Sequence, residues 1–251
     1  MKKHPIEEEV AIPTPDKKII YATIGQPKGK PKGMIVFVHG LASTALWPTM
    51  LLGSWYFRNK GYAYCRVNLY DWRPKARSLM TSDLLQHAKD TDTVVAYLKR
   101  RKFRNICAVG HSFGGLTLLQ AKTSALTAVS FWDMTSFISF PPKFWFRKDK
   151  NTGATYTRGS YELLMSRRYV NGIKNFPDEL GLISKIKVPC QICYASGEGA
   201  MLVESSRRYY AHLSADKELV AIPHASHSFT EEGIAENLFS KTEKWFRKYC
   251  A

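Results

Sequence analysis

A serine lies among glycines in the segment Gly110-His111-Ser112-Phe113-Gly114-Gly115. The apolar run 105–112 predicts a strand that ends at this serine, and residues 114–123 predict a helix that follows it. At such a sharp strand-to-helix turn, the glycines avoid collisions with neighbouring backbone. The serine hydroxyl is exposed at the tip, and the helix N-terminus behind it favours negative charge. Ser112 is therefore the predicted nucleophile.

A serine hydroxyl is a weak nucleophile and needs a general base. His227 lies in the segment IPHASHSF, directly after a strand predicted over residues 218–222. An α/β sheet would deliver this loop to the same edge as Ser112, so His227 is the predicted base. His224 in the same loop is the competitor. The H-x-x-H spacing also suggests a metal site, but no helix or third ligand accompanies it, and we expect no metal.

The base in turn needs a carboxylate that orients its ring. Glu198 is the carboxylate in the loop after the strand predicted over residues 188–196. It gives the chain order nucleophile, acid, base that such a strand-and-turn arrangement commonly shows. Asp133, at the end of the strand predicted over 125–133, faces the same sheet edge. Glu198 is the expected acid, and Asp133 is the alternative.

Negative charge that develops on a substrate oxygen needs hydrogen-bond donors. His39-Gly40 closes the buried strand predicted over residues 34–40. The backbone N–H of the next residue, Leu41, together with that of Phe113, would form an oxyanion hole with two donors. We expect His39 to brace this loop and His111 to pack, with neither taking part in the chemistry.

Strands that alternate with helices predict an α/β fold with a parallel sheet and helices on both faces. Further strands are expected at 6–12, 18–24 and 62–70, and further helices at 46–60, 81–102, 203–213 and 231–249. Residues 134–187 are too long for an ordinary connection and carry ten Lys/Arg against four Asp/Glu. Nine aromatic residues lie there: Phe137, Phe140, Phe144, Trp145, Phe146, Tyr156, Tyr161, Tyr169 and Phe176. We expect a lid inserted into one domain that spans residues 1–251.

Composition sets broad limits. The 251 residues are 45% hydrophobic and 23% charged, which excludes a disordered or fibrous chain. No apolar run reaches the length of a membrane span, and three glutamates interrupt the N-terminus where an export signal needs apolar residues. Five scattered cysteines favour a reducing compartment, so a cytoplasmic location is expected. The pair Cys190 and Cys193 has C-x-x-C spacing, but in a strand its side chains would point to opposite faces.

The residues from Met34 to Cys250 resemble the α/β-hydrolase superfamily of serine hydrolases. The resemblance rests on His39-Gly40, on the segment Gly110 to Gly115, and on IPHASHSF with His227. It implies the α/β-hydrolase fold, ester or thioester hydrolysis, and no metal or organic cofactor. The superfamily's usual aspartate would stand where this chain has Glu198. The aromatic insertion looks like the lids of feruloyl-type and monoglyceride-type esterases, and is similar to that of the acyl-carrier-protein thioesterase of bacterial bioluminescence.

The expected activity is therefore hydrolysis of a small-molecule carboxylic ester with a hydrophobic acyl or aromatic group. The alternatives are hydrolysis or transfer of a carrier-bound acyl thioester, and ligand binding without catalysis on the same scaffold. The net charge of +16 suits an acidic carrier or an anionic lipid surface as a partner. The basic run KRRKFR at 99–104 is expected to solvate a helix end, and no nucleic-acid-binding module accompanies it.

Overall fold

The computed structural model describes residues 7–141, 143, 146–152, 154–157, 163–197 and 200–250. Its central sheet has the strand order β1-β2-β4-β3-β5-β6-β10-β11. The strands are β1 (Glu7–Pro13), β2 (Ile19–Gly25), β3 (Met34–Val38), β4 (Ala63–Val67), β5 (Ile106–His111), β6 (Ala128–Trp132), β10 (Cys190–Ser196) and β11 (Lys217–Pro223). The six strands from β4 to β11 run parallel, while β2 is antiparallel to β4 and to β1. The carboxyl ends of the parallel strands therefore share one edge.

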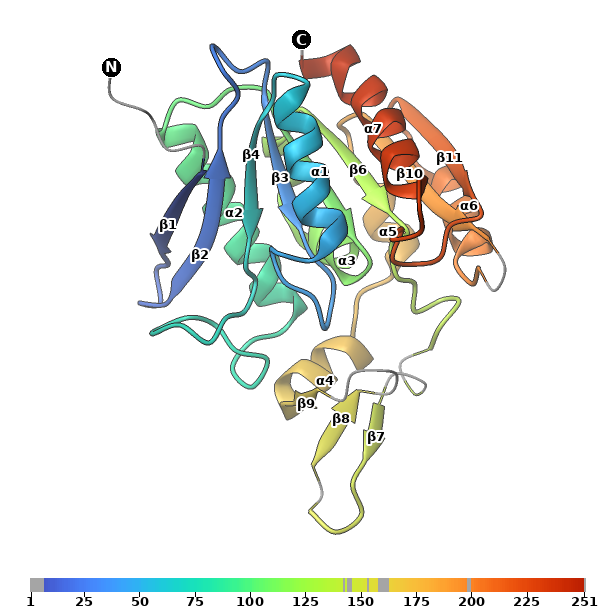
Figure 1. Ribbon diagram of the computed structural model, residues 1–251. Helices are drawn as coiled ribbons and strands as arrows, with labels where there is room; N and C mark the ends of the chain where they lie inside the picture. The colour runs from blue at the N-terminus through green and yellow to red at the C-terminus, as the bar shows by residue number, and fades with distance from the viewer. Residues whose placement is uncertain are drawn as a thin grey trace.

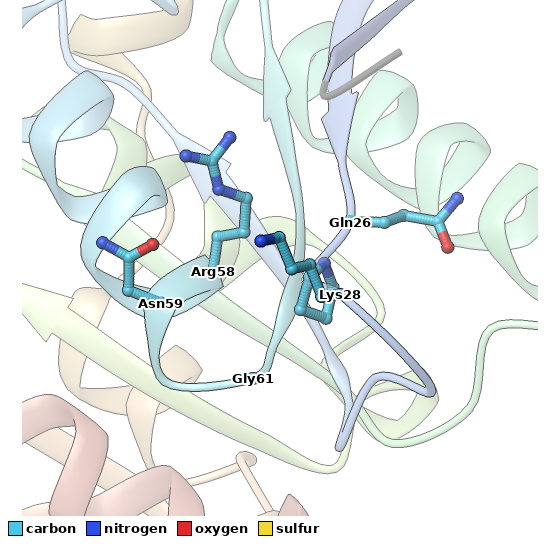
Figure 2. A pocket seen from close by; sticks show the side chains of 6 residues that line it. Gln26, Lys28, Arg58, Asn59 and Gly61 are labelled. Carbon is cyan, nitrogen blue, oxygen red and sulfur yellow. The ribbon is translucent and has the colours of Figure 1, made fainter. Parts of the chain in front are cut away.

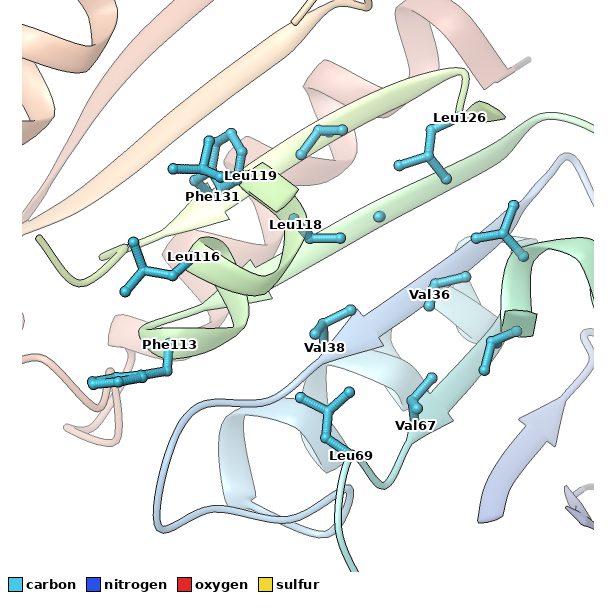
Figure 3. Packing of buried hydrophobic residues seen from close by; sticks show 14 of the residues in the cluster. Val36, Val38, Val67, Leu69, Phe113, Leu116, Leu118, Leu119, Leu126 and Phe131 are labelled. Atoms are coloured by element: carbon cyan, nitrogen blue, oxygen red, sulfur yellow. The ribbon is translucent and has the colours of Figure 1, made fainter. Parts of the chain in front are cut away.

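Helices cover both faces of this sheet (Figure 1). Helices α1 (Pro48–Asn59) and α7 (Ile234–Cys250) pack on one face around Phe37, Phe57 and Trp132. Helices α2 (Leu84–Arg100), α3 (Phe113–Gln120) and α6 (Val203–His212) contribute to the apolar cluster of the other face. Figure 3 shows part of this second cluster, in which Leu118 of α3 packs near Val36 and Val38 of β3.

The predicted elements are confirmed with shifts of a few residues at their ends. Strand β3 is buried along its whole length, as a strand covered by helices on both sides must be. Cys190 belongs to one apolar cluster and Cys193 to the other, which confirms that their side chains point to opposite faces. The structure also joins Cys107 on β5 to Cys250 at the end of α7 in a disulfide, which the scattered cysteines did not predict. These two residues are 143 positions apart, so only the fold brings them together.

The segment 134–187 lies between β6 and β10, and its strands and first helix lie beyond the carboxyl edge of the sheet (Figure 1). It holds a small second sheet of β7 (Phe146–Lys148), β8 (Thr155–Thr157) and β9 (Leu164–Met165), followed by α4 (Arg167–Lys174) and α5 (Glu179–Ile183). Strands β7 and β8 pair antiparallel and form a hairpin. Arg168 on α4 donates to Asp83, the N-cap of α2, at 2.6 Å and ties the insertion to the main body.

The opposite, amino-terminal edge of the sheet is basic. A hollow of about 430 Å³ is lined by Gln26, Pro27, Lys28, Arg58, Asn59 and Gly61 (Figure 2). A neighbouring hollow of about 710 Å³ shares Gln26 and includes Lys30, Lys32, Arg101, Lys102 and Arg104. The run 99–104 thus ends α2 and helps to line this edge. Among the helices of the described residues, none has the length and apolar character needed to span a membrane.

Candidate active site

Ser112 lies between β5 and α3 with the backbone angles φ 55° and ψ −124°. This strained conformation lifts the side chain out of the strand and toward the carboxyl edge of the sheet. The glycines around it leave no room for side chains. A Cβ on Gly114 would lie 2.1 Å from the Val38 carbonyl oxygen, and one on Gly110 would lie 2.7 Å from the Gly114 carbonyl oxygen. The close approach of β3, β5 and α3 at this turn therefore requires the glycines that the sequence provides.

His227 contacts both the nucleophile and a carboxylate. Its Nε2 is 2.9 Å from Ser112 Oγ, and its Nδ1 is 2.6 Å from Asp133 Oδ2. A carboxylate only accepts, so Nδ1 carries the proton and Nε2 is left to accept the hydrogen of the Ser112 hydroxyl. The competitor His224 has an exposed side chain and lies three residues away. Within the described residues no cluster of His, Cys, Asp and Glu could hold a metal ion.

Asp133 follows β6 directly and is almost fully buried. Its Oδ1 accepts from the Ala195 backbone N–H on β10 at 3.0 Å, and its own N–H donates to the Cys193 carbonyl oxygen at 2.7 Å. Both bonds to the neighbouring strand hold the carboxylate toward His227. The expected acid, Glu198, lies outside the described residues. Asp133, which the sequence offered as the alternative acid, is thus the carboxylate that contacts His227.

The loop that carries His227 is fixed from two sides. Thr49 on α1 donates its hydroxyl to the Ser228 carbonyl oxygen at 2.6 Å. His111 Nε2 lies 2.8 Å from the His227 carbonyl oxygen, so it donates its proton there. Burial lowers the pKa of His111 to about 4, which keeps its ring neutral beside His227. His111 therefore braces the loop that carries His227 instead of only packing.

The loop after β3 passes against the nucleophile. A Cβ on Gly40 would lie 2.9 Å from Ser112 Cβ, so a glycine is needed at this position. The Gly40 carbonyl oxygen accepts from His39 Nδ1 at 2.8 Å and from the Tyr70 hydroxyl at 3.3 Å. The N–H and C=O of a trans peptide point in opposite directions, so these bonds fix the direction of the Leu41 N–H. Phe113, the other expected donor, is the first residue of α3.

The protonation of His39 agrees with this arrangement. The Leu69 backbone N–H donates to His39 Nε2 at 3.2 Å, so the single proton of the neutral ring is on Nδ1. Burial lowers the pKa of His39 to about 4. His39 thus braces the loop, as expected, by donating to the Gly40 carbonyl oxygen. Tyr70 donates to the same oxygen, and nothing in the sequence indicated this contact.

Two further groups beside the site had no signal in the sequence. The Thr135 hydroxyl lies 3.0 Å from Ser112 Oγ and is buried. Glu179, at the start of α5, accepts from the Phe137 backbone N–H at 2.6 Å, from the Ser136 hydroxyl at 3.0 Å, and from the Tyr209 hydroxyl. Burial raises the pKa of this carboxyl group. Glu179 thus anchors the loop that follows Asp133.

Aromatic rings connect the base of the insertion to the nucleophile turn. The Phe137 ring lies 5.8 Å from the Phe113 ring and 5.3 Å from the Phe176 ring, both edge-on. Tyr169 on α4 is buried in the main apolar cluster. Of the expected lid aromatics, Phe144, Trp145 and Tyr161 lie outside the described residues. Phe137 and Phe176 thus form the aromatic contact between the insertion and the turn at Ser112.

A serine, histidine and aspartate in hydrogen-bond contact at the carboxyl edge of a mostly parallel sheet define the class of serine-hydrolase-like α/β proteins. Residues 35–236 match the model of the alpha/beta hydrolase family. The chain belongs to that family, which confirms the resemblance and the fold that the sequence predicts. No curated protein matches the chain in sequence.

Solved structures share the fold over nearly the whole chain. Est1E from Butyrivibrio proteoclasticus, solved with ferulic acid bound, superposes with a TM-score of 0.81 at 17% identity and covers 96% of this chain and 98% of its own. The esterase domain of a Rhodothermus marinus protein has a TM-score of 0.74 at 15% identity, over 98% and 99% of the two chains. The monoacylglycerol lipase of Paleococcus ferrophilus has a TM-score of 0.67 at 17% identity, over 91% and 98%. The fold is therefore that of a hydrolase, with esterases and lipases among the neighbours.

Proposed function

We propose that the chain is a serine hydrolase that cleaves carboxylic esters with a hydrophobic acyl or aromatic group. The observation that carries the proposal is the continuous contact from Ser112 Oγ through the His227 ring to Asp133. Fold similarity alone does not fix an activity, whereas this arrangement has the geometry of an activated nucleophile.

In the first half of the reaction, Ser112 Oγ attacks the ester carbonyl carbon while its proton passes to His227 Nε2. Asp133 accepts from Nδ1 throughout and stabilises the imidazolium ion. The backbone N–H groups of Leu41 and Phe113 would donate to the oxyanion. Collapse of the tetrahedral intermediate breaks the bond to the leaving alcohol, which takes the proton from Nε2 and leaves an acyl-enzyme. Water then attacks the acyl carbon by the same steps, and no cofactor is needed.

The choice of Asp133 over Glu198 as the acid rests on direct contact. Asp133 is almost fully buried and occupies the Nδ1 side of the His227 ring at 2.6 Å. The chain order then becomes Ser112, Asp133, His227, which retains the sequence nucleophile, acid, base. The acid follows β6 instead of β10, one strand closer to the nucleophile.

The proposed substrate class follows from the insertion 134–187, which we take as a lid over the site. The Phe137 ring packs on Phe113 beside Ser112, and the Phe176 ring packs on Phe137, so an apolar acyl chain or an aromatic ring would meet apolar side chains there. Ferulic acid bound to Est1E is an aromatic acid on the same fold, which is in keeping with this class of substrate.

Hydrolysis of p-nitrophenyl esters from acetate to laurate, with Ser112→Ala in parallel, tests the proposal. We expect turnover by the wild-type protein with an optimum at one chain length, and loss of turnover in Ser112→Ala. Labelling by a fluorophosphonate reports the nucleophile independently of the substrate. No turnover and no labelling would reject the serine hydrolase and favour a non-catalytic ligand-binding protein.

A second candidate is hydrolysis or transfer of an acyl thioester on an acidic carrier. It is favoured by the exposed cations Lys148 and Lys150 on the β7–β8 hairpin of the insertion. Fluorophosphonate labelling without turnover of any p-nitrophenyl ester, followed by turnover of acyl-coenzyme A, would support this candidate over the ester hydrolase.

A further inference from the structure

We propose that Thr135 is a fourth catalytic side chain, which donates a hydrogen bond to the oxygen of the nucleophile. This inference rests on the proposed serine hydrolase function and adds a residue to its site. Thr135 Oγ1 lies 3.0 Å from Ser112 Oγ, and the Thr135 side chain is 1% exposed. The nucleophile therefore has two hydrogen-bond neighbours, Thr135 and His227.

The direction of the bond follows from counting protons. The Ser112 hydroxyl has one hydrogen, and attack on a carbonyl group requires that it point to His227 Nε2, 2.9 Å away. The Ser112–Thr135 contact can then be a hydrogen bond only if Thr135 Oγ1–H donates to Ser112 Oγ. In the reactive arrangement the nucleophile gives one hydrogen bond and accepts another.

The position of Thr135 is determined by bonds on both sides of it in the chain. Its backbone N–H is 3.3 Å from the Ser112 carbonyl oxygen, which holds it at the nucleophile turn. The next two residues, Ser136 and Phe137, both donate to the buried carboxylate of Glu179. A threonine hydroxyl that only filled space would not need this double anchorage.

The consequence for the reaction is a stabilised oxygen nucleophile. As the Ser112 O–H bond breaks and its proton moves to His227, negative charge builds on Oγ before the new bond to the acyl carbon is complete. The Thr135 hydroxyl donates to that charge and keeps its own proton, so no atom is gained or lost. In the acyl-enzyme, Oγ is an ester oxygen and a weaker acceptor. When hydrolysis expels Oγ from the acyl group, charge returns to it, and the same donor acts again.

The experiment compares Thr135→Val with Thr135→Ser, which retains the hydroxyl. The readouts are the second-order rate of fluorophosphonate labelling and kcat/KM for the best p-nitrophenyl ester. A hydrogen bond to a developing charge predicts that Thr135→Val slows both by about 10- to 100-fold. Thr135→Ser should stay within about 3-fold of the wild type. Thr91→Val on α2, which removes a buried hydroxyl that donates to the His87 carbonyl oxygen, is the matched control.

The pH dependence separates a donor from a structural role. Loss of a donor should lower the plateau of kcat/KM and leave the acidic limb of the pH profile at the same pH. Unchanged labelling by Thr135→Val would overturn the proposal, as would faster labelling, which would mean that Thr135 withholds the Ser112 proton from the base. A shifted acidic limb with no rescue by Thr135→Ser would assign Thr135 to structure alone. Failure of the wild type to label would instead reject the serine hydrolase itself.

Discussion

Asp133 and Glu198 differ in a way that single substitutions resolve. Asp133 accepts hydrogen bonds from His227 Nδ1 and from the Ala195 backbone N–H. An asparagine has only one oxygen to accept with. Its NH₂ group would face either the Ala195 N–H, which is also a donor, or His227 Nδ1, which would then have to lose its proton and leave the ring in the wrong tautomer. We expect Asp133→Asn to lower kcat by about 10³- to 10⁴-fold with little change in fold. Glu198→Gln should change kcat by less than about 3-fold. A large loss from Glu198→Gln with a small one from Asp133→Asn would restore Glu198 as the acid.

Three buried histidines make the folded state sensitive to acid. Burial lowers the pKa of His39 and His111 to about 4 and that of His87 to about 3, from an ordinary value of 6.5. Between pH 6.5 and 4, these histidines therefore bind protons in the unfolded chain but stay neutral in the folded chain. Their contribution to stability is complete above pH 6.5 and is lost as the pH falls toward 4.

His87 offers a test of this acid sensitivity away from the proposed triad. Its Nε2 is 2.9 Å from the Ser82 hydroxyl, and glutamine can replace that contact without titrating. We expect the unfolding free energy of His87→Gln, measured by urea titration, to depend less on pH between 4 and 6, by about 1 kcal/mol per pH unit. An equal pH slope in the two proteins would show that His87 does not remain neutral in the fold.

At the scale of elements, the loop after β6 places two side chains against Ser112 and His227. It carries Asp133 and Thr135. The next two residues of the loop, Ser136 and Phe137, donate to the buried carboxylate of Glu179, and so does Tyr209 of α6. A strand end, a helix start and a second helix thus meet at one carboxylate. Since this loop also begins the insertion 134–187, the insertion and Asp133 share one anchor.

Substitutions of Glu179 should separate the hydrogen bonds from the charge. Glu179→Ala leaves the Phe137 N–H and two hydroxyls unpaired, and we expect a loss of about 3 kcal/mol in unfolding free energy with lower kcat. Glu179→Gln keeps an acceptor and avoids a buried charge. Burial raises the pKa of Glu179, so the contribution of this carboxyl group to stability falls as the pH rises above about 4.5, and the glutamine variant should lack this fall. If the unfolding free energies of the wild type and Glu179→Gln, measured by urea titration, depended equally on pH, the raised pKa of Glu179 would be contradicted.

The sequence was sufficient for the elements, for the turn at Ser112 and for His227, but not for the carboxylate that contacts His227 or for the contact between Thr135 and Ser112. Apolar runs and glycine punctuation are local, so strands such as β5 and the turn at Ser112 could be placed directly. The acid depends on which loop reaches Nδ1 of His227, and two adjacent strand ends offered a carboxylate. Thr135 and Tyr70 act through contacts made only after β4, β5 and β6 are aligned. Their residue types are common in loops and carry no signal of their own.

At the scale of the whole molecule, positive charge gathers at two ends. One group lies at the amino-terminal edge of the sheet around the hollows that contain Lys30 and Lys102 (Figure 2 shows the neighbouring hollow). The other is the insertion beyond the carboxyl edge. The length of β5 separates these edges by about 20 Å, which exceeds the Debye length of about 8–10 Å at ordinary salt. We therefore expect the insertion's cations, which lie beyond the edge that carries Ser112, to influence a charged substrate there more than the cations of the far edge do.

This asymmetry predicts which charges steer an anionic substrate. We expect kcat/KM for octanoyl-coenzyme A to fall several-fold between 20 and 200 mM salt, while that for neutral p-nitrophenyl octanoate stays nearly constant. The double variant Lys148→Glu/Lys150→Glu on the β7–β8 hairpin should lower the first value at low salt and flatten its salt dependence. The matched pair Lys30→Glu/Lys102→Glu makes the same change in net charge at the far edge and should have little effect. An equal loss from both pairs would mean that the field of the whole molecule, and not the insertion, attracts the substrate. Equal salt sensitivity of the two substrates would remove the case for an acidic carrier altogether.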